Sequence, residues 1–174
     1  RRDSAIAVDY LEQEIQTLTT RIKQLQEEEQ TARKAANAQA ALDAFMAREP
    51  LERELWVLKR QKLGHLLFMD ITKGVTAFAD MFDEATLAYR FYVRETLLNQ
   101  INPYSEQLSP EQRYKVDSRR VELLRDYGDY AQARDLATAI LQKENVTPEQ
   151  QIDMLIQRGN AEIRLAHLDK GKAD

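Results

Sequence analysis

The sequence predicts an all-α protein, and three observations support this fold class. Charged residues make up 31% of the 174 residues and aromatic residues only 7%, whereas β-strands favour aromatic and β-branched runs. The chain has only five glycines and four prolines, and none of them lies between residues 4 and 48. Apolar residues recur at spacings of three and four, which is the helical period. The expected architecture is a long antiparallel helical hairpin, or coiled-coil arm, followed by helix-turn-helix pairs.

Residues 1–73 are predicted to form the arm. A single helix is expected over residues 4–48, because the alanine-rich part beyond Glu29 favours helix. Pro50 suits the first turn of a new helix, so the tip of the hairpin is expected near Glu49–Pro50. The alternative is a homodimer in which the N-terminal helix pairs with a second copy. In either case the coiled-coil seam, about three heptads long, consists of Val8, Leu11, Ile15, Leu18, Ile22 and Leu25.

Residues 74–103 are rich in apolar residues and are predicted to form a connecting helix. Gly64 and Gly74 are expected to mark a bend or break before it, because glycine weakens a helix. Asn102 and Pro103 are expected to end it. Its aromatic residues are expected to lie in a core beneath neighbouring helices, with a groove for a partner as the alternative; they are Phe78, Phe82, Tyr89, Phe91 and Tyr92.

Residues 104–174 are predicted to contain helix-turn-helix repeats. Two similar segments, Ser109–Gln112 and Thr147–Gln150, each offer a capping hydroxyl, a first-turn proline and an acidic residue, so each predicts a helix start. Between them, Gly128–Tyr130 predicts a tight turn, because glycine suits the left-handed residue that ends a helix and an aspartate can cap the next one.

This hairpin resembles a tetratricopeptide repeat through Gly128, Asp129, Tyr130 and the packing residue Ala133. A second, incomplete copy resembles the family through Gly159, Asn160, Ala161 and Leu165, with His167 in its turn position, whereas Val121, Ala137 and Gly171 depart from the pattern. The resemblance implies stacked helix pairs with a concave surface for a peptide or helix of a partner protein. By family position the partner-binding residues are Lys115, Glu122, Arg125, Asn160, Ile163 and Arg164, together with Ser118, Asp126, Asp153 and Ile156.

The sequence offers no catalytic constellation. It has no cysteine, and its two histidines, His65 and His167, lie in no catalytic motif. Asp80, Asp83 and Glu84 form an acidic helix face without the accompanying histidine of a carboxylate metal site, so no metal, cofactor or small-molecule substrate is predicted. The net charge of −4 disfavours nucleic acid as a partner. No apolar run reaches the roughly twenty residues that span a bilayer.

These observations predict a non-enzymatic adaptor or scaffold for protein–protein interaction, with the arm used for assembly and the repeat surface for partner binding. The alternative is a structural or signal-transmitting helical segment of a larger protein, and a binder of nucleic acid or membrane surfaces is a third hypothesis. Because the chain begins at Arg1, it is expected to be a fragment or a processed product, and whether more repeats or a membrane anchor adjoin it stays open. The compartment stays open between the cytoplasm and an extracytoplasmic location.

Overall fold

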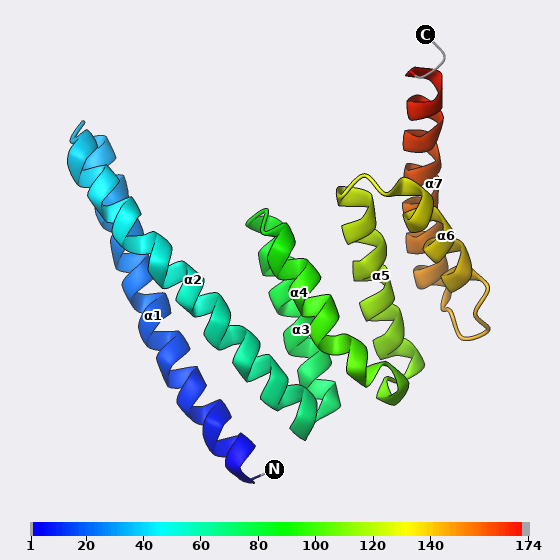
Figure 1. Ribbon diagram of the computed structural model, residues 1–174, viewed down its shortest axis with the longest axis horizontal. Helices are drawn as coiled ribbons and strands as arrows, with labels where there is room; N and C mark the ends of the chain where they lie inside the picture. The colour runs from blue at the N-terminus through cyan, green and yellow to red at the C-terminus, as the bar shows by residue number, and fades with distance from the viewer. Residues whose placement is uncertain (1, 172–174) are drawn as a thin grey trace. The chain divides into compact units, whose positions relative to one another are not determined.

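The structure, a computed structural model, describes residues 2–171 and the side chains of residues 2–168. These residues form helices joined by short connections, with no strand among them, which confirms the all-α fold class (Figure 1). The contacts within the chain divide it inside helix α3 (Ile71–Leu87) into two compact units, Arg1–Ala77 and Phe78–Asp174.

The first unit is built on helices α1 (Arg2–Lys34) and α2 (Ala38–Met69), which pack side by side (Figure 1). They are antiparallel, because Glu12 near one end of α1 pairs with Lys62 (2.6 Å) and Glu29 near the other end pairs with Arg48 (2.7 Å). Four seam residues are buried, namely Val8, Leu11, Ile22 and Leu25, and Ile15 and Leu18 are partly buried. The buried side chains of α2 are Ala41, Ala44, Leu55, Trp56, Leu63 and Leu67.

The turn between α1 and α2 lies at residues 35–37, which corrects both the expected tip near Glu49–Pro50 and the expected single helix over residues 4–48. Ala36 adopts a left-handed conformation (φ 54°), as residues that end helices often do. The Asn37 side chain then accepts a hydrogen bond from the backbone N–H of Ala40 at 3.1 Å and caps α2. Pro50 lies inside α2. The Asn37 cap therefore marks the start of α2, although alanines surround it.

Glu29 interrupts the apolar seam, and its carboxylate is buried between two arginines. It accepts hydrogen bonds from Arg48 across the hairpin and from Arg33 on its own helix, both at 2.7 Å. Arg48 also lies 3.0 Å from Glu52. A buried charge of this kind is tolerated because charge-assisted hydrogen bonds replace its lost hydration.

The break between α2 and α3 lies at Asp70, and Gly64 is part of α2. The Asp70 carboxylate accepts hydrogen bonds from the backbone N–H groups of Thr72 and Lys73 and so caps the start of α3. Gly74 has a different role from the expected break, because it permits close packing. A Cβ atom at Gly74 would lie 2.6 Å from Leu67 Cδ2 and 2.8 Å from Leu67 Cα.

Replacement of Gly74 by alanine is expected to lower the free energy of unfolding by about 2 kcal/mol, because the backbone of Leu67 cannot move aside without separating α2 from α3. The matched control is Gly159→Ala, since a Cβ at Gly159 meets no atom within 4 Å. That control should gain up to about 1 kcal/mol from helix propensity. Urea unfolding, followed by far-UV circular dichroism, measures the free energy of unfolding of both variants. Equal stabilisation by both substitutions would contradict the packing role of Gly74.

The second unit begins in α3 and continues with helix α4 (Phe91–Ile101) and the 3₁₀ helix η1 (Asn102–Gln107). The predicted single connecting helix over residues 74–103 is therefore two helices, because Tyr89 adopts a left-handed conformation (φ 53°) that reverses the chain. The aromatic cluster expected in the core is also divided. Phe78 and Phe82 are fully buried, whereas Tyr89 and Tyr92 are exposed.

Three helices complete this unit: α5 (Pro110–Asp126), α6 (Tyr130–Leu141) and α7 (Pro148–Gly171). Both predicted helix starts are confirmed, since Ser109 and Thr147 each exchange two hydrogen bonds with the glutamine three residues later. Gly128 has a φ of 81°, and the Asp129 carboxylate caps α6 by accepting a hydrogen bond from the N–H of Gln132. The predicted turn between α5 and α6 is therefore confirmed.

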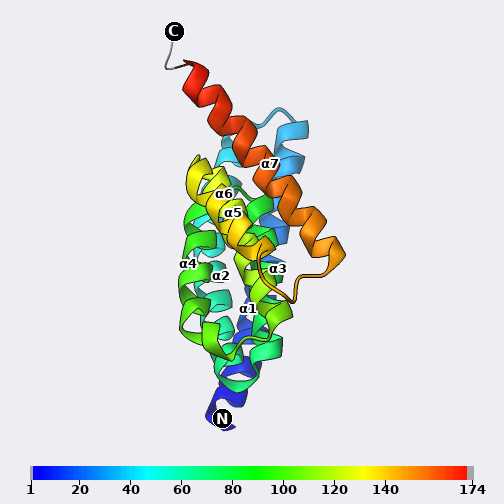
Figure 2. The same cartoon turned by 90° about the vertical axis from the view of Figure 1, so that its right-hand side faces the viewer.

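Helix α6 packs between its neighbours, and Figure 2 shows it beside α7. Small side chains allow this close packing, because Ala133, Ala137 and Ala161 are fully buried together with the larger Val121. The complete buried cluster is Val121, Ala133, Ala137, Ile140, Met154 and Ala161. Helix α7 continues through His167, so the turn expected there in the second repeat is not formed. Residues 172–174 of that predicted repeat lie outside the described part of the chain.

Candidate partner-binding groove

A groove of about 710 Å³ lies where the end of α5 and the start of α6 approach α7. All its lining residues belong to the second unit. It contains four of the six residues predicted to bind a partner, namely Arg125, Asn160, Ile163 and Arg164, and also Asp126, which the family pattern placed on the same surface. The other lining residues are Tyr130 and His167.

Helix α7 forms one wall of the groove. Asn160, Ile163, Arg164 and His167 follow one another at spacings of three, one and three, so a single helix face presents them. Among the described residues, the side chains of Asn160, Arg164 and His167 have no hydrogen-bond or ion-pair partner. Several of the hydrogen-bonding groups on this wall are therefore available to a ligand.

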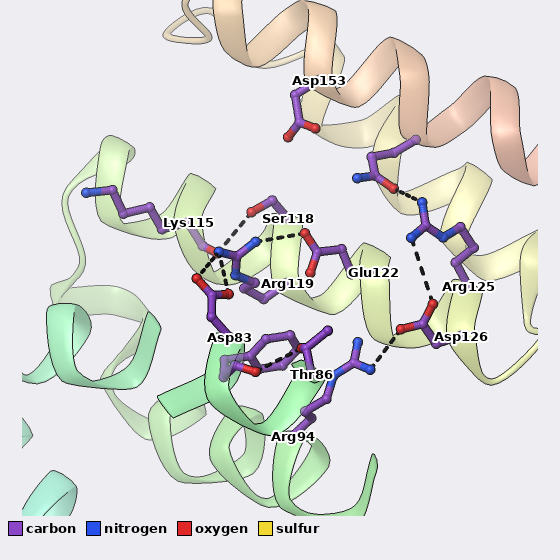
Figure 3. A network of polar contacts seen from close by, with 12 residues as sticks. Asp83, Thr86, Arg94, Lys115, Ser118, Arg119, Glu122, Arg125, Asp126 and Asp153 are labelled. Carbon is purple, nitrogen blue, oxygen red and sulfur yellow. Dashed lines mark hydrogen bonds and ion pairs between the residues drawn. The ribbon is translucent and has the colours of Figure 1, made fainter. Parts of the chain in front are cut away.

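The opposite wall rests on a buried arginine. Arg94 of α4 is only 1% exposed, and its guanidinium lies over the ring of Phe82, 4.8 Å from the centroid. Its Nη1 donates to Asp126 at 2.8 Å, while its Nε and Nη2 have no partner among the described residues. Figure 3 shows this pair next to Arg125, which donates to Gln157 and lies 3.8 Å from Asp126.

This arrangement gives the groove a positive character. Its lining carries two arginines and one carboxylate, and that carboxylate is already balanced by the buried Arg94. The chain as a whole has a net charge of −4, so the groove differs from the average surface. A group that binds here beside Arg164 would meet planar guanidinium donors, which suit carboxylates.

The other two predicted site residues lie outside the groove. Lys115 pairs with Glu111 on the exposed side of α5 (3.2 Å), and Glu122 pairs with Arg119 (2.8 Å). Arg119 also pairs with Asp83 of α3 at 2.7 Å, as Figure 3 shows. Asp83, considered above as part of an acidic face, therefore takes part in an ion pair between helices.

Ser118 and Asp153 are also committed to contacts within the fold. Ser118 is buried and donates to the carbonyl of Lys115, and Asp153 accepts a hydrogen bond from the Tyr114 hydroxyl at 2.7 Å. Burial and this hydrogen bond raise the pKa of Tyr114 above its usual value, so the hydroxyl remains a donor at neutral pH. The Tyr114–Asp153 hydrogen bond joins α5 to α7, and neither Ser118 nor Asp153 lines the groove.

Tyr130 and His167 were not predicted as groove residues. Tyr130 was assigned to the turn, but it is the first residue of α6 and lies beside the end of α5. His167 was assigned to a turn of the second repeat, but α7 remains helical there and places His167 on the face of Asn160 and Arg164. The spacing of seven residues between Asn160 and His167 could have indicated this.

Comparison with protein-family models, curated proteins and solved structures finds no match. Within the described residues, no helix combines the length and the apolar character needed to cross a membrane. In the same part of the chain, no three histidine, aspartate or glutamate side chains are grouped so that they could hold a metal ion.

Proposed function

We propose that this chain is a non-enzymatic protein-interaction module that binds a segment of a partner protein in the groove between α5, α6 and α7. The observation that carries this proposal is the grouping of Asn160, Arg164 and His167, without partners among the described residues, on the wall of a groove of about 710 Å³. The proposal takes α5 and α6 as one tetratricopeptide-like pair, with α7 as the first helix of an incomplete second pair. In such repeats the first helix of each pair faces the ligand.

Two properties of the groove support a macromolecular ligand. It is an open groove formed by several helices, and its lining is mainly polar with one exposed isoleucine, Ile163 (58% exposed). Sites for small molecules are usually enclosed and mostly apolar, whereas interaction surfaces combine arginine with apolar contacts and a polar rim. The groove corresponds better to the second class.

The arm is proposed to serve in assembly, and the groove in partner binding. Its seam residues pack against α2 within the same chain, so a homodimer through Val8, Leu11, Ile22 and Leu25 would require the hairpin to open. We therefore propose that assembly through the arm uses its exposed side chains. Leu42, Phe45 and Met46 are exposed near the turn and lie at helical spacing on α2.

The groove is tested by selecting peptides from a random displayed library against the whole chain and measuring the affinity of the selected peptides by calorimetry. Arg164→Ala is expected to weaken their binding at least about tenfold, because removing an arginine contact at an interface typically costs more than 1 kcal/mol. Arg134→Ala is the matched control, since Arg134 is partly exposed on α6, pairs with its neighbour Asp135 and lies outside the groove.

The control variant is expected to bind the selected peptides as the original chain does. If no peptide is selected, or if Arg134→Ala weakens binding as much as Arg164→Ala, the groove is not a partner site. Either result favours the alternative function, a structural or signal-transmitting helical segment.

A further inference from the structure

Helix α7 has two apolar faces. One contains Met154 and Ala161, which are fully buried in the cluster with α6. The opposite face carries three isoleucines, Ile152, Ile156 and Ile163, which are 59%, 57% and 58% exposed. A helix that is apolar on opposite faces is typical of a helix packed between two others. The described part of the chain covers only one of these faces.

The exposed isoleucines have the spacing of a helix-packing seam. Ile152, Ile156, Gly159 and Ile163 follow one another at intervals of four, three and four residues, which places them along one side of α7. Gly159 lies in the middle of this seam, and a Cβ there would meet nothing within 4 Å. The seam therefore has a shallow notch that a large side chain of a second helix can fill.

The polar wall of the groove runs beside this seam on the same helix. Ile163 belongs to both, and Arg164 and His167 lie next to it on the side that faces α5. A helix packed on the seam would therefore bring one of its flanks over Arg164 and Arg125. Among the described residues that line the groove, Asp126 supplies the carboxylate beside these two cations, and Asp126 is held by Arg94, so the complementary flank is negatively charged.

We propose that the partner segment is an amphipathic helix with an acidic flank, which packs its apolar side on Ile152, Ile156 and Ile163 and directs carboxylates to Arg164 and Arg125. This inference rests on the proposed function of the groove and specifies the chemistry of its ligand. The apolar contacts supply most of the affinity, and the carboxylate–guanidinium contacts determine which helices bind and in which orientation.

Two designed peptides of equal length test the proposal. Both carry leucines at intervals of four, three and four residues, and their flanking positions are glutamate in one and lysine in the other. Fluorescence anisotropy measures binding of each labelled peptide to the whole chain. The glutamate peptide is expected to bind at least about tenfold more tightly than the lysine peptide, and added salt should reduce this difference.

Two substitutions in the chain locate the binding. Ile156→Ser is expected to weaken binding of the glutamate peptide at least about tenfold. Arg164→Gln is expected to remove most of the preference for the glutamate peptide over the lysine peptide. Leu87→Ser and Arg134→Gln are the matched controls, because Leu87 is 83% exposed on α3 and Arg134 lies outside the groove. All four side chains are at least partly exposed, so each variant is expected to fold.

Three results would overturn the inference. The two peptides could bind equally, the glutamate peptide could bind without dependence on Ile156, or the chain could form a dimer by light scattering that Ile156→Ser dissociates, in which case a second copy occupies the seam. If library peptides require Arg164 but the glutamate peptide does not bind, the inference fails while the proposed function of the groove stands.

Discussion

Replacing Arg94 by alanine is expected to lower the free energy of unfolding of the second unit by about 3 kcal/mol. The side chain is 1% exposed and fills the space between the rings of Phe82 and Phe91, with centroid distances of 4.8 and 5.6 Å. Alanine would leave a cavity there and remove the ion pair with Asp126. Urea unfolding followed by far-UV circular dichroism measures the loss, and hydrogen exchange of α4 and α5 localises it.

Arg94→Met distinguishes the contribution of the side chain's packing to stability from the contribution of its charge. Methionine keeps most of the packing against Phe82, and Asp126, whose side chain is 30% exposed, keeps the nearby Arg125, so we expect a loss of only about 1 kcal/mol. Arg134→Ala should change the free energy of unfolding by less than about 0.5 kcal/mol, because the Arg134 side chain is 42% exposed and pairs only with its neighbour Asp135 among the described residues. If Arg94→Ala costs no more than Arg134→Ala, the guanidinium does not support the groove wall.

Replacing Leu63 by alanine is expected to lower the free energy of unfolding of the α1–α2 unit by about 3 kcal/mol. Leu63 is fully buried on α2. Truncation removes hydrophobic burial and leaves a cavity. The single tryptophan, Trp56, is buried on the same helix, so its fluorescence during urea unfolding reports this unit.

Val57→Ala is the control for Leu63. Val57 lies on α2 and is 49% exposed, so its truncation should cost less than about 1 kcal/mol. If Val57→Ala shifts the midpoint of the fluorescence transition as much as Leu63→Ala does, α2 does not bury the face that contains Leu63.

The sequence was most informative where one or two residues control local structure. Ser109 and Thr147 start helices through side-chain hydrogen bonds within four residues, and Gly128 turns the chain because its φ of 81° suits glycine. The hairpin turn at residues 35–37 was missed because alanines around Asn37 indicate a continuous helix. There the packing of α1 on α2 over a long interface, together with the Asn37 cap, outweighs helix propensity.

The groove residues could be predicted in part from the resemblance to a tetratricopeptide repeat. Arg125, Asn160, Ile163 and Arg164 were expected by family position on one surface, and all four line the groove. Lys115 and Glu122 were expected there by the same family pattern, but they pair with Glu111 and Arg119 nearer the start and middle of α5. Which part of a helix face is hollow depends on the neighbouring side chains, here Tyr130 of α6, and the family pattern of single positions does not contain that information.

The carboxylate of Glu29 within the seam has a consequence for how the arm folds. If α1 slid by one heptad along α2, Glu29 would face Ala41 or Leu55 instead of Arg48, and both of these are buried apolar residues. The misaligned hairpin would keep leucines and isoleucines in contact, but the Glu29 carboxylate would be buried among apolar side chains without an arginine partner. Glu29 thus excludes alternative alignments that the repetitive apolar pattern would otherwise allow, as single polar seam residues do in coiled coils.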